Sequence, residues 1–378
     1  MSLPPLIALD IGSTKVACAV GLPHEQGPGF ELVGSSLVPY PTCADTWLSD
    51  AVMVSRTIEQ AVEASGASGK AQSALVTFHH PRLTSDRVQA ALTLADEPIV
   101  IRAQDLMRLQ RRALDQTLGI DREPLLVERL GCSGNGFEGV RDPRGLSATR
   151  LIGTFHVIAM PMAARQALIH AVESAGLDIV RLIYSLPAAL ASVWEPEWNH
   201  RRVLLIDRGG LATDLGCFVG PILEAVHVLP RGGITLATAM ASELHVSLDQ
   251  ALTWTLEGNS GRRPEARAMV EEEWKTLQHA IEALLKTVVR PEAILLTGRG
   301  ALTDGFAEWL EAANGIPTSL GRPARLHQLG DLLQQVGLGS ALGLLELATR
   351  ASSGFVPGSQ PFLNRLLART RLILTEYF

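Results

Sequence analysis

The feature that most constrains the fold is a pattern that occurs twice: an apolar strand, an Asp-x-Gly turn and a second apolar strand. The first copy covers residues 6–20 and contains Asp10 and Gly12, and the second covers residues 203–219 and contains Asp207 and Gly209. Such a pattern is typical of a hairpin in a larger sheet. The copies are too diverged and too far apart for a solenoid repeat. They therefore predict an α/β protein with two duplicated lobes.

Both turns have the composition of a phosphate-binding loop, although a single turn of this kind is more often only a turn. Glycine lets backbone amides approach an anion, Lys15 adds a charge, and the Asp10 carboxylate suits Mg²⁺ held through water. Two more glycine turns follow the strands expected at 222–229 and 294–297. Four glycine turns in this order indicate a phosphate-binding site more specifically than a single turn does. We predict that the residues around the phosphates and the nucleoside are Asp10, Gly12, Ser13, Thr14, Lys15, Asp207, Gly209, Gly210, Thr213, Asp214, Gly232, Gly233, Gly298, Gly300 and Ala301, with Asp10 and Asp207 organising the metal.

Composition excludes several other classes of protein. The formal net charge of −6 gives no basic field for nucleic acid. The four cysteines, Cys18, Cys43, Cys132 and Cys217, form no CxxC pair, which argues against a zinc site or a disulfide framework and favours a reducing compartment. No secretory signal begins the sequence, and no apolar run reaches the roughly 18–20 residues that span a bilayer. We expect a cytoplasmic protein.

The four glycine turns resemble those of the actin–hexokinase–Hsp70 nucleotide fold, and nearly the whole chain resembles FtsA, the actin-like family of bacterial cell division. The most specific stretch is residues 142–151 (DPRGLSATRL), followed by His156-Val157-Ile158. It is similar to the D-P-x-G-M-x-G-x-R-L…H-x-I segment of the small inserted domain of FtsA. Residues 175–177 (AGL) and 186–189 (LPAA) continue the match. PilM proteins of type IV pili share the fold, but the DPxG segment is closer to FtsA.

The resemblance implies a duplicated, ribonuclease H-like two-lobed fold with an inserted subdomain. The predicted units are a first lobe at 1–83 and 161–200, an insertion at 84–160, a second lobe at 201–236 and 291–350, a small subdomain at 237–290, a linker at 351–361 and a terminal helix at 362–378.

The end of the chain reads as a Gly/Pro/Ser linker followed by an amphipathic helix with one basic face. A helix of this composition lies on an anionic membrane, and the alternative is docking on the protein's own core or on a partner. The resemblance to FtsA, whose members end this way, favours the membrane. The residues predicted to contact it are Phe362, Leu363, Arg365, Leu366, Leu367, Arg369, Arg371, Leu374, Tyr377 and Phe378.

The chain departs from the FtsA pattern in its second phosphate loop and around the nucleoside. Leu211 and Ala212 replace a glycine and a hydroxyl residue of the family's D-I-G-G-G-T-T-D run, and Arg299 replaces a glycine. Leu252 and Thr255 stand near the place of a Glu and a Lys that hold the ribose and base. We expect weakened ATP binding and slow or absent hydrolysis. Arg208 and Arg299 are expected to point to solvent rather than to pair with phosphate.

The function that the resemblance implies is that of a scaffold. Such a protein binds ATP and Mg²⁺, polymerises on the inner face of the cell membrane and tethers FtsZ filaments, whose C-terminal peptide it receives through residues 237–290. One alternative is a PilM-like pilus adaptor. Another is a turning-over ATPase or kinase, for which Asp214 is the candidate catalytic aspartate.

Three other motifs have structural interpretations. Residues 134–139 match GxGxxG but lie in a polar loop, which disfavours a dinucleotide site. His79-His80 lacks a third ligand at zinc spacing, so a place at the surface or at a domain junction is expected. Residues 271–273 (EEE) are expected on a solvated helix face.

Overall fold

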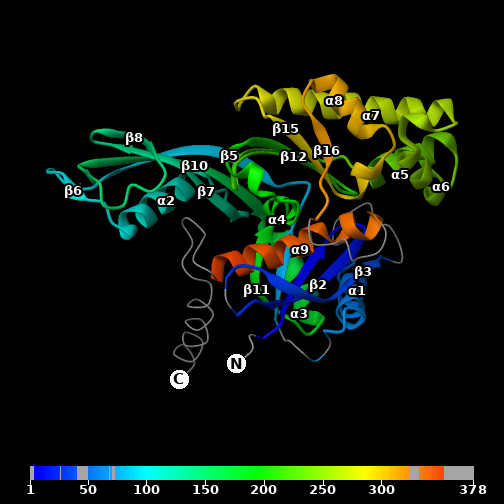
Figure 1. Ribbon diagram of the computed structural model, residues 1–378, viewed down its shortest axis with the longest axis horizontal. Helices are drawn as coiled ribbons and strands as arrows, with labels where there is room; N and C mark the ends of the chain where they lie inside the picture. The colour runs from blue at the N-terminus through cyan, green and yellow to red at the C-terminus, as the bar shows by residue number, and fades with distance from the viewer. Residues whose placement is uncertain are drawn as a thin grey trace.

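Two five-stranded sheets with the same topology form the framework of the protein (Figure 1). The computed structural model describes residues 4–25, 27–40, 50–67, 69, 73–323 and 332–352. The first sheet has the order β11-β4-β1-β2-β3. Its strands are β1 (Leu6–Ile11), β2 (Lys15–Pro23), β3 (Phe30–Pro39), β4 (Ser73–Phe78) and β11 (Asp178–Tyr184).

The second sheet has the order β14-β13-β12-β15-β16. Its strands are β12 (Arg202–Arg208), β13 (Thr213–Val219), β14 (Ile222–Leu229), β15 (Ala293–Thr297) and β16 (Thr318–Leu320). In each sheet three consecutive strands pair antiparallel and two later strands are added parallel to the first. The duplication predicted from the two Asp-x-Gly turns is therefore present in the fold.

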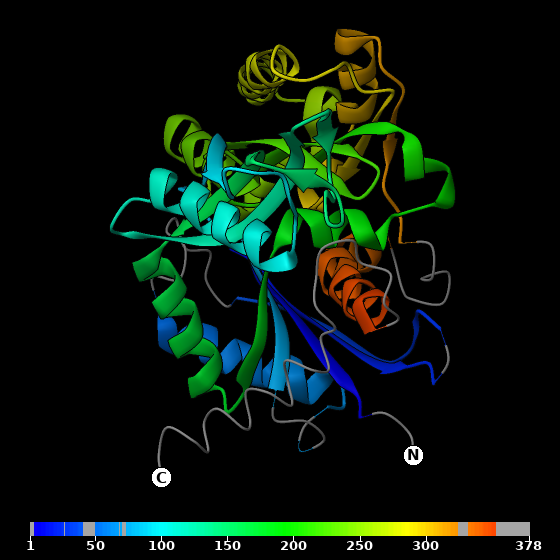
Figure 2. The same cartoon turned by 90° about the vertical axis from the view of Figure 1, so that its left-hand side faces the viewer.

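Helices cover both faces of the first sheet. On one face lie α1 (Ala51–Ala64) and α3 (Met162–Ser174), which contact each other. On the other lie α4 (Ser185–Ser192) and α9 (Leu332–Ser352), as Figure 2 shows for α9. The Asp50 side chain caps α1 by accepting a hydrogen bond from the Met53 amide at 2.9 Å.

Helix α9 corrects one predicted boundary. We placed residues 291–350 in the second lobe, but the apolar side of α9 packs on the first sheet. Leu338, Ala341 and Leu345 share a buried cluster with Ala17 and Ala19 of β2. Burial of that side against small residues of β2 stabilises α9 on the first sheet, although α9 follows the strands of the second lobe in the sequence. The chain thus returns to its first lobe after β16.

The helices of the second lobe pack around a mainly aliphatic core that also holds the aromatic rings of Trp274 and Phe306. They are α5 (Gly233–Leu244), α6 (Leu248–Glu257), α7 (Pro264–Leu285) and α8 (Phe306–Asn314), with the short 3₁₀ segments η1 (Pro196–His200), η2 (Gly258–Ser260) and η3 (Arg299–Leu302). The Trp274 ring lies 5.5 Å from that of Phe306 and 5.2 Å from that of Trp309. Helix α8 begins at Phe306, directly after Gly305, whose left-handed backbone (φ 74°) favours glycine.

The insertion forms a separate sheet beside the two lobes (Figure 1). Its elements are β5 (Thr84–Thr93), β6 (Ile99–Val100), α2 (Ala103–Thr117), β7 (Arg122–Gly134), β8 (Phe137–Val140), β9 (Ser147–Ala148) and β10 (Arg150–Pro161). Helix α2 packs on β5 and β10, and Leu109, Leu151 and Phe155 lie in their common core. The GxGxxG match spans the β7–β8 hairpin rather than a strand-to-helix turn.

A buried histidine joins the insertion to the second lobe. His156 of β10 is 2% exposed. One ring nitrogen lies 2.8 Å from the Ser85 hydroxyl of β5, and the other lies 3.1 Å from the Leu223 carbonyl of β14. This histidine belongs to the H-x-I part of the motif quoted above, so that part of the motif fixes a domain junction.

The linker at 351–361 lies beyond the described chain except for the end of α9, and the predicted membrane helix at 362–378 lies entirely outside the described residues. Within the part that is described, no helix combines the length and the apolar character needed to cross a bilayer.

Candidate functional site

The two Asp-x-Gly turns face each other between the lobes. Each is closed by the same backbone hydrogen bond: the Gly12 amide donates to the Lys15 carbonyl at 3.0 Å, and the Gly209 amide donates to the Ala212 carbonyl at 2.9 Å. Gly210 lies directly against the first turn, because a Cβ atom there would come 2.7 Å from the Ser13 hydroxyl oxygen. The absence of side chains at these glycines therefore lets the two loops approach closely.

A pocket of about 280 Å³ opens between these turns and collects most of the predicted site. Predicted residues that line it are Asp10, Gly12, Ser13, Thr14, Lys15, Asp207, Gly209, Gly210, Gly233, Gly298 and Gly300.

Four predicted residues lie behind the pocket wall instead: Thr213, Asp214, Gly232 and Ala301. The Thr213 hydroxyl donates to the Arg231 carbonyl at 2.8 Å, and Gly232 packs on the backbone of the second turn, where a Cβ would come 2.4 Å from the Gly209 carbonyl. Asp214 and Ala301 are buried. These four residues thus support the lining rather than form it.

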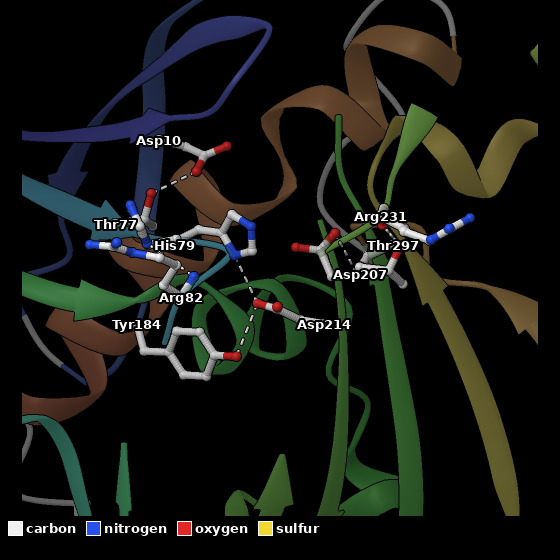
Figure 3. A network of polar contacts seen from close by, with 11 residues as sticks. Asp10, Thr77, His79, Arg82, Tyr184, Asp207, Asp214, Arg231 and Thr297 are labelled. Carbon is white, nitrogen blue, oxygen red and sulfur yellow. Dashed lines mark hydrogen bonds and ion pairs between the residues drawn. The ribbon is translucent and has the colours of Figure 1, made fainter. Parts of the chain in front are cut away.

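The duplication extends to a threonine beside each aspartate, which the sequence analysis missed (Figure 3). Thr77 of β4 donates to Asp10 at 2.6 Å, and Thr297 of β15 donates to Asp207 at 3.2 Å. Each threonine lies in the parallel strand next to the one that carries the aspartate: Thr77 is the penultimate residue of β4, and Thr297 is the last residue of β15. A small hydroxyl residue at that place in both halves is the signal that could have identified them.

The two equivalent aspartates differ in pKa. Although burial alone would raise the pKa of Asp10, Lys15 at 2.9 Å and the Thr77 hydroxyl hold it below its ordinary value. Asp207 has no such cation, and burial together with the Asp214 carboxylate raises its pKa to about 6.

These side chains give little support for a permanently bound metal ion. In the described part of the chain no group of three or more His, Cys, Asp or Glu side chains is placed to hold an ion. Asp10 is already paired with Lys15, which leaves Asp207 as the carboxylate that fits Mg²⁺ arriving with phosphates, an ion that uses only one or two protein carboxylates in such sites. The predicted metal role of Asp10 and Asp207 stays a prediction.

A second polar network, centred on Asp214, joins the lobes (Figure 3). His79 Nδ1 lies 2.9 Å from Asp214 Oδ2, and the Tyr184 hydroxyl donates to the same oxygen at 3.0 Å. Burial opposes a charge on His79, but the nearby Asp214 carboxylate raises its pKa. His79 thus lies at a junction between lobes, and Asp214, the candidate catalytic aspartate, is 0% exposed and already paired.

The part of the pocket predicted to hold a nucleoside is lined by α6 and η3. Leu252, Thr255 and Leu256 of α6 line the pocket together with Arg299 and Gly300 of η3. Arg208 lines the same region and is 2% exposed, so the expectation that it points to solvent is wrong. The alternation of β12 turns its side chain away from Asp207 and into the second lobe, where its guanidinium lies 5.2 Å from the Phe306 ring centroid.

Comparison with known proteins agrees with this architecture. Residues 81–159 match the family model described as the SHS2 domain inserted in FtsA. The predicted resemblance to FtsA is confirmed. The chain is 26% identical over 373 residues to the cell division protein FtsA of Pseudomonas aeruginosa, covering 90% of this chain and 88% of the relative. It is 21% identical to FtsA of Escherichia coli, covering 90% and 89% respectively.

Solved structures show the fold of this FtsA-like chain. A PilM–PilN type IV pilus biogenesis complex matches with a TM-score of 0.70 at 18% identity, covering 93% of this chain and 99% of that one. MreB5 of Spiroplasma citri bound to ADP matches with a TM-score of 0.53 at 12% identity, covering 94% and 99%. The actin-like two-lobed fold predicted from the four glycine turns is therefore present.

Proposed function

We propose that this FtsA-like protein binds ATP between its lobes, polymerises on the inner face of the cell membrane and tethers FtsZ filaments there. The observation that carries the proposal is the convergence of both Asp-x-Gly turns on one pocket, in a chain whose insertion matches the SHS2 domain of FtsA. Nucleotide-bound neighbours of the same fold, such as MreB5 with ADP, support a nucleotide as the ligand.

ATP binding is tested most directly at Lys15. Its ammonium lies in the pocket, only 10% exposed, and is the cation nearest to the first phosphate loop. We expect Lys15→Met to lower ATP affinity at least tenfold in calorimetry, because a charge-assisted contact to phosphate is lost. Lys275→Met, on the exposed face of α7, removes the same charge and should change nothing. Equal affinities for both variants would contradict a nucleotide at this place.

Membrane binding is tested on the full chain with vesicles containing anionic lipid. Leu366→Ser with Leu367→Ser removes apolar surface from the predicted helix, whereas Asn364→Ser changes its polar face. We expect wild type and Asn364→Ser to co-sediment with the vesicles and the leucine variant to stay in solution. An ATP-dependent rise in the pellet would support assembly governed by nucleotide. Sedimentation of the leucine variant would place lipid binding elsewhere.

Partner binding is assigned to the small subdomain at 237–290. A second pocket there is lined by Gln250, Trp254, Glu257, Ser260, Gly261, Arg262 and Arg263, and the Arg263 guanidinium lies 5.6 Å from the Trp254 ring centroid. An aromatic face beside two arginines suits a peptide with apolar and carboxylate groups. We expect Trp254→Ala to weaken binding of the FtsZ C-terminal peptide at least tenfold in fluorescence anisotropy, and exposed Val289→Ala to leave it unchanged.

A pilus-assembly adaptor is the second candidate, favoured by the TM-score of 0.70 to the PilM–PilN complex. The two functions predict opposite results in one experiment that offers the full chain a PilN-derived peptide, the FtsZ peptide and anionic vesicles. Binding to the PilN peptide alone would favour the adaptor. Binding to the FtsZ peptide and vesicles would favour the division protein.

Turnover is expected to be slow at most. Asp214 is held by His79 and Tyr184, so it lacks the freedom of a general base. Steady phosphate release that disappears in Asp214→Asn, with ATP affinity unchanged, would instead favour an enzyme.

A further inference from the structure

Helix α2 of the insertion carries arginines on the side that is turned away from its own core. Leu106 and Leu109 of α2 are buried against the strands β5 and β10. Because an α-helix has about 3.6 residues per turn, Arg108, Arg111 and Arg112 project from the other side of the helix. All three arginines are exposed, and they define the outer face of α2.

The charge on this outer face is largely uncompensated. Arg108 Nη1 lies 3.5 Å from Asp105 Oδ1, and the Arg108 side chain is still 61% exposed. Arg111 and Arg112 form no ion pair with any residue that the structure describes. The exposed acidic residue of α2 is Asp115, so three arginines stand against one exposed carboxylate. The outer face of α2 is therefore a local basic surface on a chain whose net charge is negative.

Exposed apolar side chains accompany the arginines. Met107, one turn before Arg111, is 58% exposed, and Ile120, three residues after the end of α2, is 101% exposed. Basic and apolar side chains exposed together are typical of a surface that binds where lipid headgroups meet acyl chains. An acidic protein would pair with the arginines alone, whereas an anionic bilayer also receives the apolar side chains.

The described chain ends on the side of the molecule that carries α2. In Figure 1, α9 runs from right to left, toward the side on which the insertion lies. Figure 2 is viewed from that side, and both α2 and the last turn of α9 lie toward the viewer. After α9 ends at Ser352, the rest of the predicted linker and the predicted membrane helix at 362–378 follow in the sequence. A flexible linker of about ten residues spans roughly 15–20 Å, so a bilayer bound by that helix would lie within reach of α2.

We propose that the outer face of α2 is a second membrane-contact surface, where Arg108, Arg111 and Arg112 bind the phosphates of anionic lipids and Met107 enters the headgroup region. The inference rests on the proposed function, since the helix at 362–378 would bring the protein to the membrane. A guanidinium can donate two hydrogen bonds to one phosphate. One weak lipid anchor binds reversibly, and a basic patch on the same molecule makes the attachment stable.

The first test uses the full-length protein with vesicles of phosphatidylcholine alone and with added phosphatidylglycerol. Arg111→Gln with Arg112→Gln removes two exposed charges from α2. The matched control, Arg267→Gln with Lys275→Gln, removes two exposed charges from α7 and changes the net charge equally. Since one arginine near an anionic bilayer favours binding about fivefold, we expect the α2 variant to bind the anionic vesicles at least tenfold more weakly than wild type and control. Binding to neutral vesicles should agree within twofold for all three proteins.

The second test locates the contact with an environment-sensitive bimane probe. The probe is attached to Met107→Cys or, as a control, to Val289→Cys, which replaces an exposed residue beyond α7. Both variants also carry Cys43→Ser, because the other three cysteines, Cys18, Cys132 and Cys217, are buried. We expect anionic vesicles to shift the emission of the probe at 107 to the blue and to leave that of the probe at 289 unchanged.

Other results would overturn the inference in distinguishable ways. Equal losses on neutral and anionic vesicles in the α2 variant would mean that these arginines act through assembly of the protein. Soluble polyglutamate that binds as tightly as the anionic vesicles, and only when the arginines are present, would assign the outer face of α2 to an acidic protein. Wild-type affinity of the α2 variant for anionic vesicles, or no blue shift at 107, would remove α2 from the membrane and leave the proposed function intact. Wild-type protein that binds no vesicles would overturn the proposed membrane binding itself.

Discussion

His79 Nδ1 lies 2.9 Å from Asp214 Oδ2, and this ion pair joins the first lobe to the second. His79 follows β4, the strand next to β1, whereas Asp214 belongs to β13, the partner of β12. Tyr184, the last residue of β11, donates to the same carboxylate oxygen. The lobes are therefore in polar contact beside the phosphate loops.

We expect Asp214→Ala to destabilise the protein by about 3 kcal/mol in urea unfolding, because it leaves His79 and the Tyr184 hydroxyl without their shared acceptor. Tyr184→Phe is the matched control. It removes one hydrogen bond of the same network and should cost about 1 kcal/mol. A free-energy loss in Tyr184→Phe as large as that in Asp214→Ala would show that the carboxylate is not the centre of the network.

The junction at His156 predicts a dependence of stability on pH. Burial lowers the pKa of His156 below 6.5, and the nearby Arg87 lowers it further, although the Leu223 carbonyl and Asp86 act in the opposite direction. A histidine with a lowered pKa in the folded state contributes its full stability above about pH 6.5 and loses it as the pH falls toward the folded value. The insertion should therefore dock less stably in mild acid.

His156→Asn keeps a neutral polar side chain at every pH and so isolates this effect. We expect it to be about 1–2 kcal/mol less stable than wild type at pH 8, because a buried hydrogen bond is lost, and this gap to narrow by pH 5.5. Other histidines titrate in both proteins and cancel in the difference. A gap that widens on acidification would contradict a lowered pKa at His156.

Helices α4 and α9 pack so closely that one glycine between them is indispensable. A Cβ on Gly343 would come 1.7 Å from the Ala188 carbonyl, whereas one on Gly339, a turn earlier, would come no nearer than 3.4 Å to Ser192 Oγ. We expect Gly343→Ala to cost about 3 kcal/mol or more, and Gly339→Ala to be neutral or slightly stabilising, because alanine favours a helix. Thermal unfolding of both variants checks this, and similar melting temperatures would contradict the close contact.

The sequence predicted where strands and helices lie along the chain better than it predicted which of them pack together. Apolar runs and glycine turns located β1, β2, β12 and β13 closely, because local pattern fixes a hairpin. The lobe on which α9 packs was mispredicted, because an apolar helix side carries no local signal for one lobe or the other. In the fold this side packs against small residues of β2 in the first lobe. Placement of a helix after a crossover depends on long-range packing, which no local pattern carries.

Only the loops of the candidate site could be predicted from the sequence, again because a local pattern marks them. A glycine two residues after an aspartate in both copies of the pattern indicates a close backbone approach, so both turns were found. Thr77, Thr297 and Tyr184 were missed because hydroxyl residues at strand ends are common and gain meaning only when the fold sets them beside an aspartate. Arg208 was placed in solvent because a charged side chain is rarely buried, and its Nη1 contacts to η3 compensate only part of that cost.

The duplicated threonines allow the two halves of the site to be compared directly. Thr77 donates to an ionised Asp10 at 2.6 Å, whereas Thr297 donates to Asp207, whose pKa is raised to about 6, at 3.2 Å. At pH 7.5 both carboxylates are ionised, and the shorter hydrogen bond is the stronger, so we expect Thr77→Val to cost about 2 kcal/mol in urea unfolding and Thr297→Val about 1 kcal/mol. Lowering the pH to 5 protonates Asp207 but not Asp10, so the cost of Thr297→Val should fall while that of Thr77→Val persists. Costs that change equally for both variants between pH 7.5 and pH 5 would mean that the two aspartates have the same pKa.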